Sequence, residues 1–370
     1  MVKRIFWSLL IAFMIVITIV VIISCEVEQS TIKKVSYKSF DNIIVFGDSL
    51  SDSAPPQTQV GNNYWVKPYG ITDKIGAPIT SEISLNYPVR KTWLNYFIEQ
   101  MDLKSGKDLT LIKGLTPNSA YSQNTSFAVA SAETGDYYLT DTTWGRDNNA
   151  KCVNGLGDYG HYNCVPGVLK QIDLYLKNVN DRPNPNSLFI IWAGGNDFYQ
   201  NIIRIATQNG QTLAHPIDNI VKAVKRLMVK GVSVQNIYVL NLPDFSMVPG
   251  VRGLLDAHIK NKYLYQGISV LISAVSQLYN TGLSVNLVLK TFGVFPANHV
   301  YSIDKLFLEV YFNKDEILQK LGLNQSVKVT CVQMKETPLC QGFLFYNGIH
   351  PTTVVHQYLA KELIKHIQRT

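Results

Sequence analysis

Two turns that follow apolar runs, and a third that precedes a predicted helix, carry the side chains of this chain that could do chemistry. Ser49 follows Ile43–Phe46, a run typical of a short buried strand. Asn196 follows the apolar run 187–192 through a glycine turn, and His350 stands just before the last predicted helix. Open parallel sheets place their chemistry at the carboxyl ends of strands, where Ser49 and Asn196 are expected. Attack by a hydroxyl on an ester carbonyl puts negative charge on oxygen, so such chemistry needs an N–H donor nearby.

These three turns resemble the sequence blocks of the GDSL, or SGNH, hydrolases. Gly47–Leu50 matches the nucleophile block, and Ser51-Asp52 matches its lipolytic extension. Gly194–Asp197 resembles the Gly-x-Asn-Asp block, and His350–Thr352 resembles the histidine block. The order of the blocks along the chain agrees with the family. An α/β-hydrolase would instead carry Gly-x-Ser-x-Gly in mid-chain, with an acid far from its histidine in the sequence.

The resemblance assigns a role to each residue. Ser49 would be the nucleophile, and His350 the base that takes its proton and later returns it to the leaving group. The oxyanion hole would consist of the backbone N–H groups of Ser49 and Ser131 and the side-chain amide of Asn196. The stretch 126–132 resembles the family's Asn-Tyr-Ala-x-Gly-Gly-Ala block, with Ser131 in place of a glycine. Ser131 keeps the backbone N–H, but that glycine can serve a positive φ.

A second departure from the family pattern lies at Asn347, where the family has an aspartate three residues before the histidine. The amide oxygen of Asn347 can orient the ring of His350, but it cannot stabilise the imidazolium by charge. Two interpretations from different classes therefore stay open. The chain is an active serine esterase with a weakened orienting residue, or it is a catalytically impaired pseudoenzyme that binds lipid or a partner.

The stretch 241–244 is similar to the lipolytic branch of the family, which includes lysophospholipases and glycerophospholipid:cholesterol acyltransferases. The resemblance implies fatty-acyl esters of phospholipids or lysophospholipids as substrates, a membrane surface as partner, and no cofactor. An acyl-serine intermediate gives hydrolysis with water and transfer with an alcohol such as cholesterol. A carbohydrate-ester deacetylase on the same fold is the alternative within the enzyme class.

The N-terminus predicts export from a bacterial cytoplasm. Lys3 and Arg4 precede an apolar run, and Cys25 follows a small residue, as in the bacterial lipobox that acylates such a cysteine. Residues 1–25 are thus a signal peptide or a membrane anchor, since about 20 apolar residues can span a bilayer. Residues 26–40 form a polar tether, and residues 41–370 the hydrolase domain. The domain is expected to be secreted or held at the membrane.

The other cysteines favour two local disulfides in an exported chain, Cys152 with Cys164 and Cys331 with Cys340. A metal site is disfavoured because no Cys-x-x-Cys occurs. The net charge of +7 is spread along the chain. It suits a solvated surface or anionic lipid, and nucleic acid is disfavoured because no basic run is interleaved with aromatic residues.

Strands that alternate with amphipathic helices predict an α/β fold of three layers, α/β/α, with a mainly parallel central sheet. Residues 53–90 are expected to be irregular and to cover the site. Besides the first strand, the predicted strands are 126–130, 187–192, 236–240 and 300–303. The predicted helices are 92–101, 166–178, 216–230, 254–279, 305–312 and 353–367.

Overall fold

The computed structural model describes most of the chain beyond the N-terminal run: residues 38–53, 91–140, 145–147, 165–207, 214–312, 316–323, 329–334, 340 and 342–370. The chain divides into the units Met1–Tyr37 and Lys38–Thr370, and every described element belongs to the second. The predicted leader, most of the tether and the predicted covering loop lie outside the described residues.

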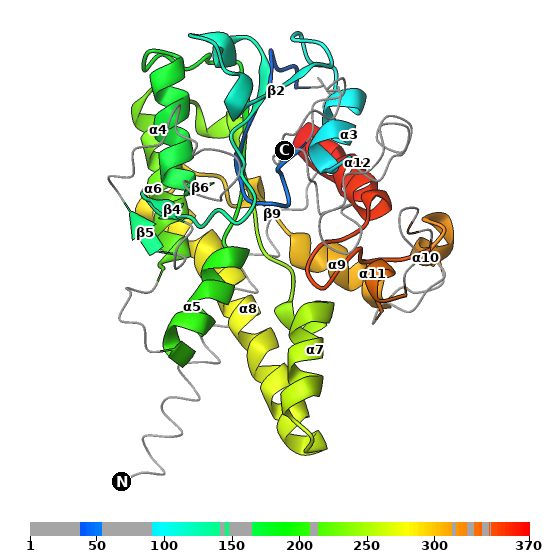
Figure 1. Cartoon of the computed structure of the whole chain (residues 1–370). Coiled ribbons are helices and arrows are strands. Elements are labelled where there is room, and N and C mark those ends of the chain that lie inside the picture. Colours follow the sequence, from blue (N-terminus) through cyan, green and yellow to red (C-terminus); the bar gives the residue numbers. More distant parts are fainter. Residues whose placement is uncertain are drawn as a thin grey trace. The chain divides into compact units, whose positions relative to one another are not determined.

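A six-stranded, fully parallel sheet in the order β2-β3-β1-β7-β8-β9 forms the centre of this unit (Figure 1). The fold class predicted from the sequence is confirmed. The strands are β1 (Ile43–Gly47), β2 (Leu109–Leu111), β3 (Asn124–Ser126), β7 (Leu188–Trp192), β8 (Ile237–Leu240) and β9 (Val300–Tyr301). A separate antiparallel sheet, β5-β4-β6, consists of β4 (Tyr138–Thr140), β5 (Gly145–Asp147) and β6 (Val165–Pro166).

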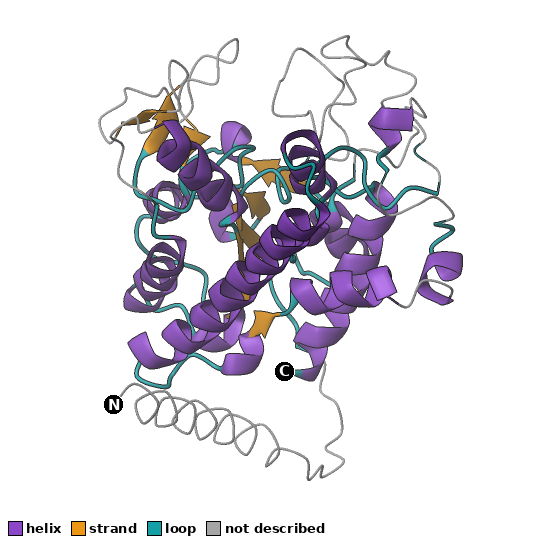
Figure 2. Ribbon diagram, turned by 90° about the horizontal axis from the view of Figure 1, so that it is seen from below, coloured by secondary structure: helices purple, strands orange, loops and turns teal. Residues whose placement is uncertain are grey.

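Helices cover both faces of the central sheet (Figure 2), because alternate side chains of each buried strand point to opposite sides. Ile44 and Phe46 of β1 join one apolar core, and Ile43 and Val45 join the other. The first core is completed by α4 (Val168–Asn178), α6 (Pro216–Val229) and α8 (Lys262–Lys290). The second is completed by α3 (Trp93–Gln100), α9 (Ile303–Phe312) and α12 (Thr353–Arg369). The remaining helices are α5 (Gly195–Thr207), α7 (Pro249–His258), α10 (Glu316–Lys320) and α11 (Cys331–Met334).

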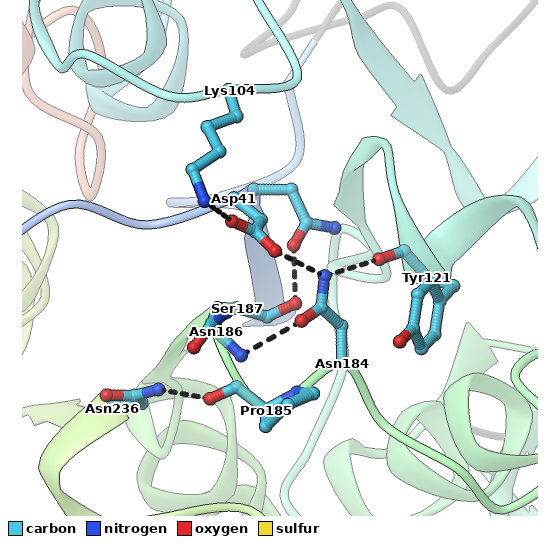
Figure 3. A network of polar contacts seen from close by, with 9 residues as sticks. Asp41, Lys104, Tyr121, Asn184, Pro185, Asn186, Ser187 and Asn236 are labelled. Atoms are coloured by element: carbon cyan, nitrogen blue, oxygen red, sulfur yellow. Dashed lines mark hydrogen bonds and ion pairs between the residues drawn. The ribbon is translucent and has the colours of Figure 1, made fainter.

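A polar network fixes the amino ends of the strands (Figure 3). Asn184 donates to Asp41 at 3.1 Å and to the carbonyl of Tyr121 at 3.0 Å. Lys104 pairs with the same aspartate at 2.7 Å and lowers the pKa of that carboxyl. Asn236, just before β8, donates to the carbonyl of Pro185 at 2.7 Å. The network holds the starts of β1, β7 and β8 in register, at the opposite end of the sheet from Ser49.

The single helix predicted over 254–279 is wrong. The structure has two helices there, α7 and α8, separated at Ile259–Asn261, and α8 continues to Lys290. The break occurs where Asn261 caps α8, its side-chain oxygen accepting from the backbone N–H groups of Tyr263 and Leu264. An asparagine oxygen that satisfies two such free N–H groups favours a new helix start over a continuous helix.

The strand predicted over 126–130 is displaced. The strand β3 ends at Ser126, but the backbone N–H groups of Phe127 and Val129 still donate to the carbonyls of Val45 and Gly47 on β1, at 2.8 and 3.2 Å. Phe127–Val129 is therefore buried beside β1, which accounts for its strand-like apolar pattern. The predictions at β7, β8, α3 and α6 agree with the structure to within two residues.

Candidate active site

Ser49 and His350 meet although 301 residues separate them in the chain. Ser49 lies just beyond β1, and His350 lies in the loop before α12. The Oγ atom of Ser49 is 3.0 Å from the Nε2 atom of His350, which is hydrogen-bonding distance. Both side chains are partly exposed while β1 behind them is fully buried. A reactive pair of this kind is therefore reachable from solvent at the carboxyl edge of the sheet.

Asn347 fixes the tautomer of His350. Its Oδ1 atom accepts from the backbone N–H groups of Ile349 at 3.0 Å and His350 at 2.9 Å, so this atom is the amide oxygen and not the nitrogen. The same oxygen is 3.0 Å from the Nδ1 atom of His350. Because an amide oxygen only accepts, Nδ1 carries the proton and Nε2 is left free to accept from Ser49.

The pKa of the base is set mainly by the packing around its ring. Burial of the ring, and to a lesser degree the nearby His356, lowers the pKa of His350 from 6.5 to about 3. Asn347, as a neutral amide, adds no negative charge that would raise this pKa. His350 is therefore neutral at physiological pH, the state that a general base requires, but it is a weak base.

The turn that presents Ser49 is built on Asp48. The backbone N–H groups of Ser51 and Asp52 donate to the Asp48 carbonyl at 3.0 Å, and that of Leu50 donates to its carboxylate at 3.0 Å. Burial raises the pKa of the Asp48 carboxyl to about 7. Glycine is needed at position 47 for space, since a Cβ there would overlap the carbonyl of Trp192 on β7. Close packing of β1 on β7, not an unusual φ, therefore accounts for the glycine.

Ser131 adopts the left-handed conformation, with φ of 69°. A glycine at this position would adopt it without steric cost, and a serine adopts it at about 1 kcal/mol. The loop is held by Asp52, whose carboxylate accepts from the Ala130 N–H at 2.9 Å. In the described part of the chain the backbone N–H groups of Ser49 and Ser131 make no hydrogen bond. Both remain available to an oxyanion.

Asn196, at the start of α5, is tied to the Ser131 loop. One hydrogen of its side-chain amide is donated to the carbonyl of Ala132 at 2.9 Å. The second hydrogen of the same amide remains for an oxyanion. Asn196 and Ser131 are both partly exposed, as Ser49 is. The structure thus brings loops from three parallel strands to one edge, with the predicted oxyanion donors on them.

Two supporting residues were missed by the sequence analysis. Gln171 on α4 is fully buried and bonds both backbone groups of Gly47, accepting from its N–H and donating to its carbonyl, each at 2.8 Å. Asp197, next to Asn196, accepts from the backbone N–H and the hydroxyl of Thr134. The signal for Gln171 was a polar residue on the apolar face of a helix, since such a buried amide must find partners.

Cys331 and Cys340 form a disulfide, as predicted. Both cysteines are buried in one cluster with Phe343 and Tyr346. The disulfide therefore packs against the residues that lead directly into the loop with Asn347. The backbone N–H of Cys331 also donates to the carbonyl of Phe345 at 3.1 Å. The other predicted pair, Cys152 with Cys164, and the lipidation candidate Cys25 lie outside the described residues.

Other features of the described residues do not compete with this site. No group of three or more His, Cys, Asp or Glu side chains is placed there to hold a metal ion. A hollow of about 700 Å³ lies between α4 and α6, lined largely by basic side chains such as Lys222 and Lys225. None of the residues discussed above lines it.

The sequence profile of the family described as GDSL-like lipase/acylhydrolase matches residues 43–363. No curated protein matches the chain significantly. The profile spans Ser49, Asn196 and His350 and the elements that bring them together. The chain therefore belongs to the GDSL-like lipase/acylhydrolase family and is an esterase- or lipase-type hydrolase.

Proposed function

We propose that the protein is an exported, membrane-associated serine esterase that cleaves fatty-acyl esters of phospholipids or lysophospholipids. The observation that carries this proposal is the line of contacts Ser49 Oγ to His350 Nε2 and His350 Nδ1 to Asn347 Oδ1, each 3.0 Å. Such a relay activates a serine without a metal or cofactor.

In the proposed reaction Ser49 attacks the ester carbonyl carbon as His350 Nε2 takes the hydroxyl proton. The carbonyl oxygen becomes negative and receives hydrogen bonds from the N–H groups of Ser49 and Ser131 and from the Asn196 amide. When the intermediate collapses, His350 gives its proton to the departing alcohol, and the acyl group stays on Ser49. Water, activated by the same histidine, then releases the fatty acid and restores the serine.

Asn347 explains how this site differs from that of a family member with aspartate. The amide orients the ring and selects the productive tautomer, as the three contacts to its oxygen indicate. It adds no negative charge when His350 becomes an imidazolium. We therefore propose a working but slowed enzyme, with the loss confined to the charge contribution.

Exposed side chains close in sequence to the site residues support a lipid substrate. Ile349, next to His350, is 55% exposed, and Tyr199, three residues after Asn196, is 52% exposed. The apolar N-terminal run, which would place the domain at a membrane, supports the same class. An acyl-Ser49 intermediate would also allow transfer to an alcohol such as cholesterol.

The second candidate is a pseudoenzyme that binds lipid or a partner, and Asn347 is the residue that favours it. A carbohydrate-ester deacetylase is a further alternative within the enzyme class. The exposed aliphatic side chain of Ile349, next to His350, favours the lipid substrate over the carbohydrate one.

Labelling with a fluorophosphonate probe tests the proposal without a choice of substrate. We expect the parent to be labelled at Ser49 and Ser49→Ala to be unlabelled with an unchanged melting temperature. A panel of phosphatidylcholine, lysophosphatidylcholine and acetylated sugars, with and without cholesterol, then identifies the substrate and the acceptor. An unlabelled parent that is folded and inactive on the whole panel would favour the pseudoenzyme.

A further inference from the structure

Helix α8 contains no charged side chain between Lys262 and Lys290. Among the described helices, it is the one whose length and hydropathy would suffice to cross a membrane, yet only 22% of its most apolar window is buried. Large apolar side chains that gather on one exposed side of a helix are normally covered by protein or by lipid. The exposed apolar surface of α8 therefore needs an occupant.

The carboxyl half of α8 belongs to the folded domain. Tyr279, Leu283 and Leu287 are buried in the core beside α6. Asn280 bonds both backbone groups of Leu242, accepting from its N–H at 3.0 Å and donating to its carbonyl at 2.8 Å. Because this half is fixed against the sheet, α8 is a surface helix of the domain and does not cross a bilayer.

The opposite side of α8 is exposed and apolar. Leu264, Leu271, Leu278 and Val285 are 55%, 61%, 72% and 47% exposed. At about 100° per residue, their seven-residue spacing places them on one side of the helix, away from the buried residues. We name these four residues the α8 apolar face. In Figure 1, α7 and the amino half of α8 extend beyond the sheet on the side where α5 begins.

The end of the α7–α8 hairpin is basic. Lys260 and Lys262 stand at the turn between the two helices, and Lys260 is held there by a bond of 2.9 Å to the carbonyl of Asp256. Leu254 on α7 adds a side chain that is 52% exposed. Apolar side chains next to lysines are the composition of an element that lies in the interface of an anionic membrane.

Both helices of the hairpin are connected to the catalytic loops. The N–H of Gly250 on α7 donates to the carbonyl of Gly348, between Asn347 and His350, at 2.6 Å. Tyr279 on α8 lies against Gly194, two residues before Asn196; Gly194 has φ of 122°, and a Cβ there would be 2.6 Å from the tyrosine hydroxyl. A membrane or protein that binds the hairpin would therefore lie on the side of the sheet where Ser49 lies.

We infer that the α7–α8 hairpin is the element that seats the enzyme on an anionic phospholipid bilayer. The α8 apolar face enters the region between headgroups and acyl chains, and Lys260 and Lys262 contact the phosphates. This inference rests on the proposed lipid substrate and names the part of the molecule that meets it. A second copy of the chain, whose α8 would pair through the heptad spacing, is the competing occupant.

Two substitutions on the face test the inference in the full chain. Leu271→Gln with Leu278→Gln removes apolar surface without adding charge. We expect turnover of mixed phosphatidylcholine and phosphatidylglycerol vesicles to fall about tenfold or more, with turnover of a soluble p-nitrophenyl butyrate unchanged. Val229→Gln is the matched control, since Val229 is 82% exposed at the far end of α6. Equal losses on both substrates, or no loss on vesicles, would overturn the inference.

The basic residues are tested by a matched pair of charge reversals. Lys260→Glu with Lys262→Glu should lower turnover on the mixed vesicles more than on phosphatidylcholine alone. Lys222→Glu with Lys225→Glu, in the hollow between α4 and α6, should not. The reverse result would move the membrane contact to that hollow and overturn the inference.

A binding readout separates this inference from the proposed function. In full-length Ser49→Ala, which cannot consume the lipid, hydrogen exchange of peptides from 250–278 should slow when the mixed vesicles are added. The slowing should disappear with the two glutamine substitutions. If the parent hydrolyses nothing, this readout still tests the surface alone. If light scattering shows a dimer that the glutamine variant converts to a monomer, and vesicles give no slowing, the face is an interface between copies.

Discussion

The side-chain oxygen of Asn347 lies 3.0 Å from the Nδ1 atom of His350 and accepts two backbone N–H groups at the same time. These three contacts decide the orientation of the amide. They place the ring proton on Nδ1 and leave Nε2 facing Ser49. The site therefore has the geometry of a catalytic triad in which the third member carries no charge.

Asn347→Asp should raise turnover. A serine protease loses about 10⁴-fold when its aspartate becomes asparagine, partly through the wrong tautomer. Here the tautomer is already correct, so we expect a gain of about 10- to 100-fold, from stabilisation of the imidazolium alone. The measurement is ester hydrolysis by parent and variant. Asn347→Ala is the control, because alanine cannot accept a hydrogen bond from the His350 ring. A folded Asn347→Asp protein with no gain would favour the pseudoenzyme.

The pH profile should differ between the same two proteins. Burial holds the pKa of His350 at about 3 in the parent, so the base stays neutral and His350 itself should add no acid limb to kcat/KM between neutral and mildly acidic pH. A carboxylate at position 347 raises this pKa toward 6.5. The variant should then lose activity as the pH falls through that value. Identical acid limbs would show that Asn347 does not control the charge of His350.

Ser131 should respond to substitution through its φ of 69°. Ser131→Gly relieves a left-handed residue at a cost in chain entropy, so the free energy of unfolding should change by less than about 1 kcal/mol. Ser131→Val places a β-branched residue there, and stability should fall by about 1–2 kcal/mol with a loss of turnover. Urea unfolding and ester hydrolysis measure the two effects. A valine variant as stable as the parent would mean that the loop can adopt another conformation.

Loss of the Cys331–Cys340 disulfide should lower stability and activity together. The chain-entropy model gives about 2–3 kcal/mol for a loop of this length. The bridge packs against Tyr346, so the loop with Asn347 and His350 should loosen as well. Cys331→Ala with Cys340→Ala, followed by urea unfolding, tests the first effect, and ester hydrolysis tests the second.

The second predicted disulfide, Cys152 with Cys164, is tested by mass mapping without reduction. Free thiols at both cysteines would refute that prediction.

The sequence predicted best those parts of the site that depend on local pattern. The apolar run before Ser49 and the one before Asn196 are short, buried and followed by glycine turns, so strand and turn agree with each other. The parallel sheet then brings both turns to one edge. Family blocks added His350, whose position depends on the packing of α12 and not on any nearby pattern.

The features that the sequence analysis missed depend on distant contacts. Gln171 meets Gly47 across 124 residues, and no local pattern states that its amide will find that backbone. Phe127–Val129 has the pattern of a strand because it is buried and still donates two backbone hydrogen bonds to β1, although the strand β3 itself ends at Ser126. The break before α8 depends on one side chain, Asn261, whose oxygen caps the new helix, while the apolar residues on both sides continue the helical pattern.

The sequence separation of 301 between Ser49 and His350 governs when the enzyme can first act. The serine follows β1, the first strand of the sheet along the chain, and is synthesised early, but its base arrives only with the loop before α12. A contact this distant in sequence carries a large loop-closure entropy, which the packing of the intervening strands and helices offsets. A chain still emerging from the ribosome, or cut short before residue 350, therefore holds a serine that cannot attack.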